Sequence, residues 1–414
     1  MQPSSVVVVG AGQAGCQVVS SLRDAGYQGR IALIGAEPQL PYQRPPLSKG
    51  HLTGKALRES LWLRPEAWYD EQGVDLHLGV RVTHVDRIAH QVQLSDGGML
   101  PYGCLVLALG SRHREIPLPG SDLEGVVGLR TLDEADEVRD KLALAHHVVV
   151  VGGGFIGMEV AATAAQLGKE ATVLEIAPQL MGRVLSRETA SFLLGAHQKR
   201  GLALELGCSA AALVGIHGSV QAVDTADGRR LPADLVLLGV GAVPCTELAL
   251  DAGLEVDNGI VVDELLRTSD PDIYAVGDCA SAPCPFAGGR HTRLESVQNA
   301  TAQGRAVAAT IAGTPTTNDS VPWFWSDQAD LKIQIAGLTT GHDEVVLTGD
   351  RSNDRFSVWC FAAGSLVGVE SVNRPADHMA ARKLLGRTPS VTADEVRAEG
   401  FDPKGAAAGA VAAG

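Results

Sequence analysis

The chain of 414 residues contains 34 basic and 48 acidic residues, which gives a net charge of −14. Such an acidic balance argues against nucleic acid as the main partner, because phosphate binding needs a basic face. Hydrophobic residues make up 45% of the chain, which excludes a disordered protein, and the length predicts about three domains.

The cysteines and the apolar runs of the sequence indicate where in the cell the protein is expected. Seven cysteines are scattered along the chain, and an odd, dispersed set indicates reduced thiols. The start of the chain does not show a basic segment followed by an apolar one, as a secretory leader would. No apolar run approaches the roughly 18 residues of a membrane span. We therefore expect a cytoplasmic protein that does not bind membranes.

The first predicted element is a buried parallel strand over residues 6–9, a run of four valines. Glycines follow at Gly10, Gly12 and Gly15. In a dinucleotide-binding fold the first allows a tight turn, the second a close approach to a pyrophosphate, and the third close packing of helix on strand. The next predicted strand leads to Glu37, where a carboxylate would meet a ribose hydroxyl.

The same pattern returns in the middle of the chain. A second valine run is followed by Gly152, Gly154 and Gly157, then a predicted helix and a strand that ends in Glu175. One glycine triplet is a weak signal, but two in the same context predict two dinucleotide-binding units. A carboxylate at the position of Glu175 favours NADH over NADPH, because it binds the free ribose hydroxyls and repels the extra phosphate.

Between the two patterns, a proline-rich loop covers residues 40–50, and a helical region is predicted at 59–72. After Glu175 we predict helices at 187–200, 296–311 and 376–386. A third region alternates like antiparallel strands. Its low-complexity end, residues 406–414, is predicted to be a disordered tail.

Five stretches carry a family resemblance: residues 41–49, 152–162, 268–280, 295–300 and 322–328. On these motifs the chain resembles the FAD-dependent NADH–ferredoxin reductases, members of the pyridine nucleotide-disulfide oxidoreductase superfamily that lack the redox disulfide. The resemblance covers about residues 4 to 400. It implies an α/β protein with two Rossmann-like domains and a C-terminal α+β domain with an antiparallel sheet.

The resemblance also implies the domain limits and the cofactors. The FAD-binding domain is expected at 1–111 and 243–321, the NADH-binding domain at 112–242, and the C-terminal domain at 322–405. The implied FAD-binding residues are Gly10, Gly12, Ala14, Gly15, Glu37, Arg44, Lys49, Val82, Arg130, Asp278, Val297 and Trp325. The implied NADH-binding residues are Gly152, Gly154, Gly157, Glu159 and Glu175.

Three residues are predicted to act at the reacting rings: Lys49, Glu159 and Trp325. We hypothesise that Lys49 and Glu159 form an ion pair near flavin N5; alternatively, Glu159 is an ordinary acid in the first turn of a helix. The resemblance places Trp325 against the isoalloxazine ring and leaves Trp323 nearer the surface. The alternative for both is a pair of interface tryptophans in a hydrophobic core.

Several residues are predicted to have no redox or metal role. Cys279 and Cys284 are separated by four residues, like a redox disulfide, but they follow Asp278 instead of lying early in the chain. We interpret them as structural thiols. The histidines lack metal-ligand spacing, so no metal is predicted. Five cations are predicted either to form a basic patch for an acidic partner or to be scattered surface charges: Arg290, Arg293, Lys332, Arg382 and Lys383.

The predicted reaction is hydride transfer from NADH to FAD, then release of single electrons to a 2Fe–2S ferredoxin on a separate chain. The family suggests that this ferredoxin feeds a monooxygenase or a ring-hydroxylating dioxygenase. Two alternatives remain open: reduction of a small molecule (peroxide, disulfide or quinone), and a redox-signalling flavoprotein. A monomer or weak dimer is expected.

Overall fold

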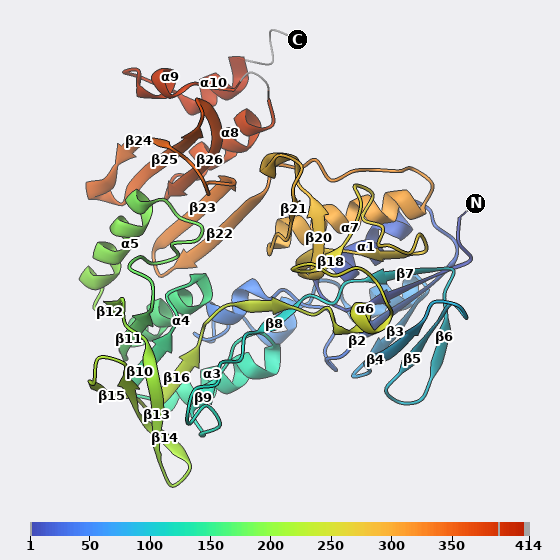
Figure 1. Ribbon diagram of the computed structural model, residues 1–414, viewed down its shortest axis with the longest axis horizontal. Helices are drawn as coiled ribbons and strands as arrows, with labels where there is room; N and C mark the ends of the chain where they lie inside the picture. Colours follow the sequence, from blue (N-terminus) through green and yellow to red (C-terminus); the bar gives the residue numbers. More distant parts are fainter. Residues whose placement is uncertain (1, 388–389, 410–414) are drawn as a thin grey trace. The chain divides into compact units, whose positions relative to one another are not determined.

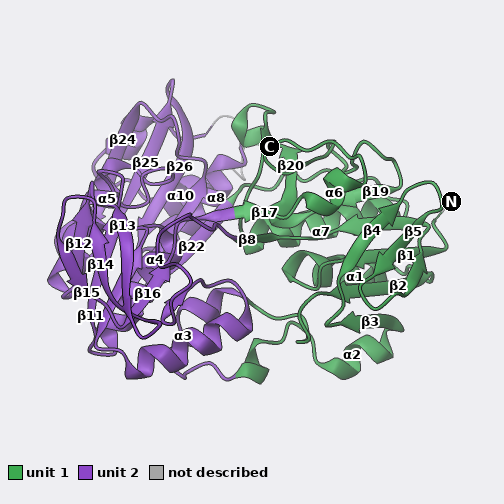
Figure 2. Ribbon diagram, turned by 60° about the horizontal axis from the view of Figure 1, so that its bottom comes forward, with its two compact units in different colours: residues 1–43, 58–112, 243–322 green, residues 44–57, 113–242, 323–414 purple. Residues whose placement is uncertain are grey.

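A computed structural model describes residues 2–387 and 390–409 of the protein. The chain divides into two compact units (Figure 2). Unit 1 contains residues 1–43, 58–112 and 243–322, and unit 2 contains residues 44–57, 113–242 and 323–414. Residues 44–57, which include most of the proline-rich loop, therefore group with unit 2, although they lie between two segments of unit 1 in the sequence. None of the helices in the described part of the chain has the length and apolar character to cross a membrane.

Unit 1 is built on a five-stranded parallel sheet in the order β19-β7-β1-β2-β3. Val6 to Val9 of β1 are buried on both faces, as a valine run without alternation predicts. Helices α1 and α7 pack against each other beside this sheet (Figure 1). The sheet strands are β1 (Ser5–Val9), β2 (Arg30–Gly35), β3 (Val74–Leu78), β7 (Cys104–Leu107) and β19 (Ile273–Ala275).

Two smaller three-stranded sheets complete unit 1, in the orders β4-β5-β6 and β18-β20-β21. Their strands are β4 (Val82–Asp86), β5 (Gln91–Leu94), β6 (Met99–Pro101), β18 (Ile260–Val261), β20 (Ala280–Pro283) and β21 (His291–Thr292). The helices are α1 (Gln13–Asp24), α2 (Glu66–Glu71), α6 (Glu247–Asp251) and α7 (Val297–Ile311). The helical region predicted at 59–72 is thus shorter: a 3-10 turn, Arg58–Leu61, precedes Pro65, and α2 begins after that proline.

Unit 2 contains a second parallel sheet, in the order β12-β11-β10-β16-β9. Its strands are β9 (Val126–Val127), β10 (His147–Val151), β11 (Glu170–Glu175), β12 (Ala203–Leu206) and β16 (Leu235–Leu238). An antiparallel sheet follows, with β13 (Ala210–Ile216), β14 (Ser219–Thr225) and β15 (Arg230–Pro232). The helices are α3 (Leu132–Leu144), α4 (Phe155–Gln166) and α5 (Arg187–Lys199). Strands β8 (Ser111–His113) and β17 (Ala242–Pro244) lie where the chain passes between the units.

The C-terminal part of unit 2 is a five-stranded antiparallel sheet in the order β22-β23-β26-β25-β24. Helix α8 packs on β23 and β26 (Figure 1). The strands are β22 (Trp323–Gln328), β23 (Leu331–Gly337), β24 (Glu344–Asp350), β25 (Arg355–Ala362) and β26 (Ser365–Val372). The helices are α8 (Pro375–Leu385), α9 (Ala393–Arg397) and α10 (Pro403–Gly409). The two parallel sheets and this antiparallel sheet confirm the predicted fold class.

The predicted disordered tail needs a correction. Residues 406–409 belong to helix α10, which packs against α8 and buries Ala407. The alanines that make this segment low in complexity are also strong helix formers, and burial against α8 decides their state. Residues 410–414 of the predicted tail lie outside the described residues.

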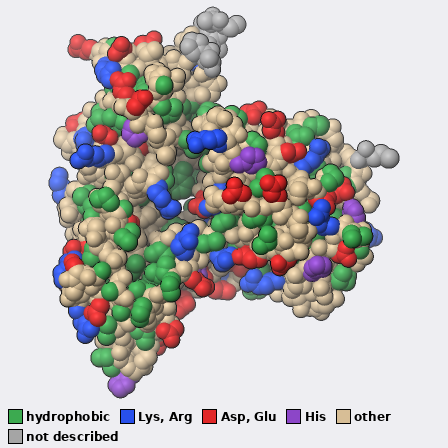
Figure 3. Space-filling model, viewed as in Figure 1, with side chains coloured by type: hydrophobic (Ala, Val, Ile, Leu, Met, Phe, Trp, Pro, Cys, Tyr) green, Lys and Arg blue, Asp and Glu red, His purple; other side chains and the backbone are tan. Residues whose placement is uncertain are grey.

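Charged side chains of both signs are interspersed on each unit over the face shown in Figure 3. The five cations considered as a patch divide between the units: Arg290 and Arg293 belong to unit 1, and the other three to unit 2. Arg293 pairs with Glu295. A single basic docking patch therefore stays a prediction.

Candidate cofactor-binding site

The first glycine loop leaves space where a pyrophosphate would lie. Gly10 has a φ of +115°, and a Cβ there would lie 2.1 Å from the carbonyl oxygen of Ala108. A Cβ at Gly15 would lie 1.9 Å from the oxygen of Gly10, whereas a Cβ at Gly12 would meet nothing within 4 Å. Gly12 is also the N-cap of α1 and adds no side-chain hydrogen bond, so the N-terminal N–H groups of α1 are available to an anion.

The second loop repeats this geometry position by position. Gly152 has a φ of +111°, and a Cβ there would lie 2.4 Å from the oxygen of Gly239. A Cβ at Gly157 would lie 2.2 Å from the oxygen of Gly152, and Gly154, the N-cap of α4, has open space around it. The residues present therefore fit a dinucleotide at each loop.

The two predicted ribose-binding carboxylates are each fixed by hydrogen bonds. Glu37 follows β2, and the buried Tyr42 hydroxyl donates to its Oε2 at 2.5 Å. Glu175 ends β11, and its two oxygens accept from the backbone N–H groups of Gly153 and Ala177, both at 2.7 Å. Each carboxylate is thus oriented at the carboxyl end of its sheet, where open α/β folds bind ligands.

The other predicted FAD contacts of unit 1 lie on four elements. Asp278 lies in a 3-10 turn after β19, and the Ser111 hydroxyl donates to its Oδ2 at 3.2 Å. Val297 is the first residue of α7, whose N-cap Ser296 accepts from the Asn299 N–H. Val82 begins β4 and is packed against the core of the unit. Ala14 is buried in α1.

Two arginines of the predicted FAD-binding set are hydrogen-bonded to each other in unit 2. The Arg44 guanidinium donates to the carbonyl oxygen of Arg130 at 2.5 Å. The Arg130 N–H in turn donates to Glu134, which also closes the capping box of α3. The loop that carries Arg44 and Lys49 is therefore fastened to the N-terminus of α3.

The predicted ion pair between Lys49 and Glu159 is present, with 2.7 Å between Nζ and Oε2. Glu159 is buried in α4, and the Lys49 side chain is 19% exposed. Ser48 donates to the same Oε2. Ser326 on β22 donates to the other oxygen, Oε1, at 2.6 Å. Two loop residues and one strand residue thus surround a single carboxylate.

The sequence analysis missed Ser48 and Ser326. Both lie inside stretches that carry the family resemblance, next to residues that were singled out, Lys49 and Trp325. That adjacency is a signal, but serine is too common in strands and turns for its type alone to select these two.

The two tryptophans of β22 form a pair, with ring centroids 5.5 Å apart and planes inclined by 33°. The Arg382 guanidinium lies 4.6 Å from the Trp323 ring centroid, and the His378 ring lies edge-on to Trp323. Both tryptophans are half-buried. Burial lowers the pKa of His378 to about 4, so this neighbour of Trp323 is neutral near pH 7.

All seven cysteines lie within the described residues and are free thiols. Cys279 and Cys284 are buried, and burial raises the pKa of the Cys279 thiol to about 12. The two thiols are free and buried in this structure, and their interpretation as structural thiols stays a prediction. Over residues 2–387 and 390–409, no group of three or more metal-ligating side chains occurs.

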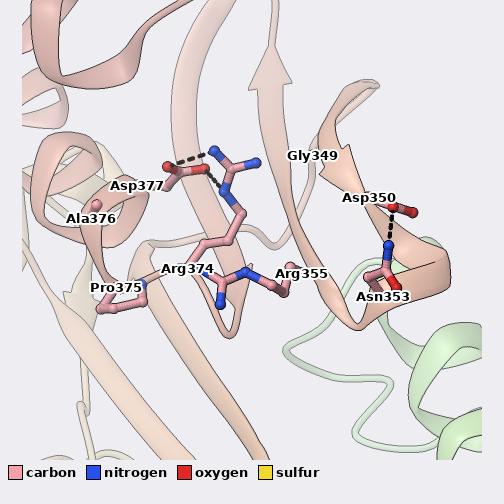
Figure 4. Close-up of a pocket in the computed structure, with 8 residues that line it drawn as sticks. All are labelled: Gly349, Asp350, Asn353, Arg355, Arg374, Pro375, Ala376 and Asp377. Carbon is pink, nitrogen blue, oxygen red and sulfur yellow. Dashed lines mark hydrogen bonds and ion pairs between the residues drawn. The ribbon is translucent and has the colours of Figure 1, made fainter.

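An open pocket of about 530 Å³ lies elsewhere in unit 2, between β24, β25 and the start of α8 (Figure 4). Its charged groups are partly paired internally: Arg374 holds Asp377 at 2.8 Å, and Asn353 donates to Asp350 at 2.6 Å. None of the residues predicted for cofactor binding lines it.

A family profile described as pyridine nucleotide-disulphide oxidoreductase matches residues 4–304. The chain belongs to the pyridine nucleotide-disulphide oxidoreductase family. A second profile, described as reductase C-terminal, matches residues 323–407, which contain the antiparallel sheet. Membership confirms the predicted resemblance, and proteins of this family are oxidoreductases that use FAD and NAD(H).

Two relatives within this family match nearly the whole chain. Rhodocoxin reductase of Rhodococcus erythropolis is 46% identical, over 97% of this chain and 93% of its own length. Putidaredoxin reductase of Pseudomonas putida is 40% identical, over 92% of this chain and 91% of its own length.

Solved structures agree with this assignment. The ferredoxin reductase for the CYP199A2 system from Rhodopseudomonas palustris has a TM-score of 0.95 at 46% identity, covering 98% of this chain and 100% of that chain. The covalent putidaredoxin reductase–putidaredoxin complex gives 0.95 at 38% identity, with 99% of each chain covered.

Proposed function

We propose that this protein is an NADH-dependent reductase that passes single electrons to a separate 2Fe–2S ferredoxin, which in turn supplies a monooxygenase or ring-hydroxylating dioxygenase. The observation that carries the proposal is the pair of matching glycine loops together with seven free thiols. Two nucleotide sites without a redox disulfide suit a flavoprotein whose acceptor is another molecule. The names of the relatives, which include rhodocoxin and putidaredoxin reductases, support a ferredoxin as that acceptor.

Bound FAD would supply the redox chemistry, since it can accept a hydride from NADH and release the two electrons one at a time. The first loop with Glu37 and Asp278 is proposed to bind FAD. The second loop with Glu175 is proposed to bind NADH, and its fixed carboxylate to select against the 2′-phosphate of NADPH. The predicted contacts of Val82, Val297, Arg44, Arg130 and Trp325 stay predictions.

Lys49 and Glu159 are proposed to orient the nicotinamide. Their charges are within hydrogen-bond distance, and only Lys49 is partly exposed. Removing one member of a buried pair leaves the other charge uncompensated, so such a pair is retained where its geometry is needed. Replacing Glu159 with Gln should slow flavin reduction by NADH, whereas an ordinary first-turn acid would leave that rate unchanged.

The free thiols also support a reducing compartment, and we propose a cytoplasmic location on that basis. The alternatives are reduction of a small molecule and a redox-signalling role. For the first, a peroxide- or disulfide-reducing enzyme of this architecture would need a reactive cysteine, and the thiols of Cys16, Cys104, Cys279 and Cys360 have raised pKa values because they are buried.

The test is NADH-driven cytochrome c reduction, with and without an added 2Fe–2S ferredoxin, and with NADPH as the control. Strong stimulation by ferredoxin and a low rate with NADPH are expected. Rapid flavin reduction without ferredoxin stimulation, with turnover on quinone or peroxide, would contradict the proposed acceptor. A long-lived reduced complex that passes few electrons to any acceptor would favour the signalling role.

A further inference from the structure

A row of buried polar side chains leads from Glu159 into the interior of unit 2. The Ser326 hydroxyl donates to Glu159 Oε1 at 2.6 Å, and the Gln328 amide donates to Ser326 Oγ at 3.2 Å. Gln328 Oε1 lies 2.7 Å from Nε2 of His197, which is on helix α5. Ser326, Gln328 and His197 are each 0% exposed. These three residues are called the Glu159 chain below.

The hydrogen bonds of the Glu159 chain all have the same direction. The Gln328 amide nitrogen faces two acceptors, Ser326 Oγ and the Met181 sulfur at 3.7 Å. Its oxygen therefore faces His197, so Nε2 of that ring carries the hydrogen. Among the described residues, Nδ1 of His197 has no hydrogen-bond partner. Burial lowers the pKa of His197, so the ring is neutral. Each donor thus points toward the carboxylate.

The carboxylate at the end of this row receives donors on both oxygens. Ser326 reaches Oε1, while Ser48 and Lys49 reach Oε2. A carboxylate is only an acceptor, so donors on both sides fix its orientation. Hydrogen bonds in series also polarise one another in a buried setting, so removing one member weakens the others.

We propose that Ser326, Gln328 and His197 are positioning residues that hold the Glu159 carboxylate, and through it the Lys49 ammonium, in the orientation needed for hydride transfer from NADH. The inference rests on the proposed function, in which Glu159 lies beside the nicotinamide. The buried, unpartnered Nδ1 of His197 supports it, because apolar packing alone would not require a polar ring there. The Glu159 chain itself is fully buried, and the network that it forms with Glu159 and Lys49 is partly exposed only at Lys49, where a substrate could reach it.

The first measurement is anaerobic stopped-flow reduction of the FAD-loaded protein by NADH. Ser326→Ala should lower the limiting rate about tenfold and change the dissociation constant of NADH less than about threefold, because the Glu159 chain orients the Glu159 carboxylate and does not itself bind NADH. Ser326→Thr keeps the hydroxyl and should restore most of the rate.

A matched control is available in the same sheet. Ser357 on β25 is also 0% exposed and donates to a buried carboxylate, Asp377 Oδ2, at 2.8 Å. Ser357→Ala therefore removes the same kind of hydrogen bond without touching the Glu159 chain, and the limiting rate should stay within about twofold of wild type. If Ser326→Ala folds poorly, Gln328→Met removes the amide donor at nearly constant volume and should also slow reduction.

A double variant and the wild-type control separate failure of this inference from failure of the proposed function. In a Glu159→Gln background, Ser326→Ala should add less than about a twofold effect, since the chain acts through Glu159. If Glu159→Gln slows reduction but Ser326→Ala and Gln328→Met match Ser357→Ala, the inference is overturned and the proposed function stands. If NADH does not reduce the wild-type flavin, the proposed function fails, and this inference fails with it.

A spectroscopic measurement tests the chain without turnover. In protein labelled with ¹⁵N-histidine, His197 should show a hydrogen on Nε2 and a bare Nδ1. Its Nε2–H resonance should shift in Glu159→Gln and Ser326→Ala, and stay in place in Ser357→Ala. A hydrogen on Nδ1 instead would reverse the chain and overturn the proposal.

Discussion

The carboxylate of Glu175 accepts a 2.7 Å hydrogen bond from the backbone N–H of Gly153, inside the second glycine loop. The contact is tight, because a Cβ on Gly153 would lie 3.1 Å from the carboxylate oxygen. The acid at the end of β11 therefore serves two purposes: it shapes the loop from within, and it presents negative charge where the ribose is expected.

Glu175→Gln should weaken NADH binding and reduce the discrimination against NADPH. The amide keeps one acceptor, but its NH₂ group faces a backbone donor and the negative charge is lost. A hydrogen bond to a charged group contributes about 1.5–3 kcal/mol, so kcat/KM for NADH should fall roughly ten- to hundredfold. Glu170→Gln, at the exposed start of the same strand, is the control. An unchanged ratio of NADH to NADPH activity would exclude Glu175 from nucleotide selection.

The glycines of the second loop should respond differently to alanine. Gly154→Ala has open space for its Cβ, so the protein should fold normally but bind NADH more weakly, because the methyl group occupies the expected phosphate position. Gly157→Ala places a Cβ 2.2 Å from the Gly152 oxygen and should lower the melting temperature by several degrees. Melting curves and the KM for NADH separate the two effects. Equal melting temperatures for the two variants would contradict the packing role of Gly157.

His378 should make the protein less stable in mild acid. Burial lowers its folded-state pKa to about 4, from an ordinary value of about 6.5. Above pH 6.5 the ring is neutral in both states. As the pH falls toward 4, the unfolded chain takes up a proton that the folded protein does not, and stability is lost at about 1.4 kcal/mol per pH unit.

His378→Leu removes this effect. By pH 5 the free energy of unfolding of the variant should exceed that of wild type by about 2 kcal/mol, or roughly 2–4 °C in melting temperature for a chain of this size, and the two should be similar at pH 7. His217→Asn, in the exposed turn between β13 and β14, is the control. Parallel profiles of stability against pH for wild type and His378→Leu would show that folding does not lower the pKa of His378.

Thiol labelling should distinguish one cysteine from six. Cys245 is half-buried and the others are buried. Burial keeps the reagent from a thiol, and for Cys16 and Cys279 it also raises the pKa, which slows the reaction because the thiolate is the reactive form. Mass mapping after brief iodoacetamide treatment should find Cys245 labelled first. Rapid labelling of Cys279 and Cys284 would contradict their structural role.

The sequence by itself determined the features that depend on local backbone chemistry. Gly10, Gly12 and Gly15 follow a valine run, and the same pattern returns at Gly152, Gly154 and Gly157, so the sequence predicts both strand–turn–helix loops without coordinates. The parallel strands are readable as apolar runs, and the antiparallel strands as alternation. Two expectations were wrong. Pro65 ends the helical region predicted at 59–72 early, so that α2 begins only after it. Residues 406–409, predicted to be disordered, belong to α10, in which Ala407 is buried.

Only the tertiary structure decided which distant side chains meet. Ser326 lies 167 positions from Glu159, and Gln328 lies 131 positions from His197. In a strand with a period of two, Ser326 and Gln328 read as a polar face turned to solvent. Packing of β22 against α4 buries that face. A buried polar group must find a partner, so the fold, and not the local pattern, assigned these residues to Glu159.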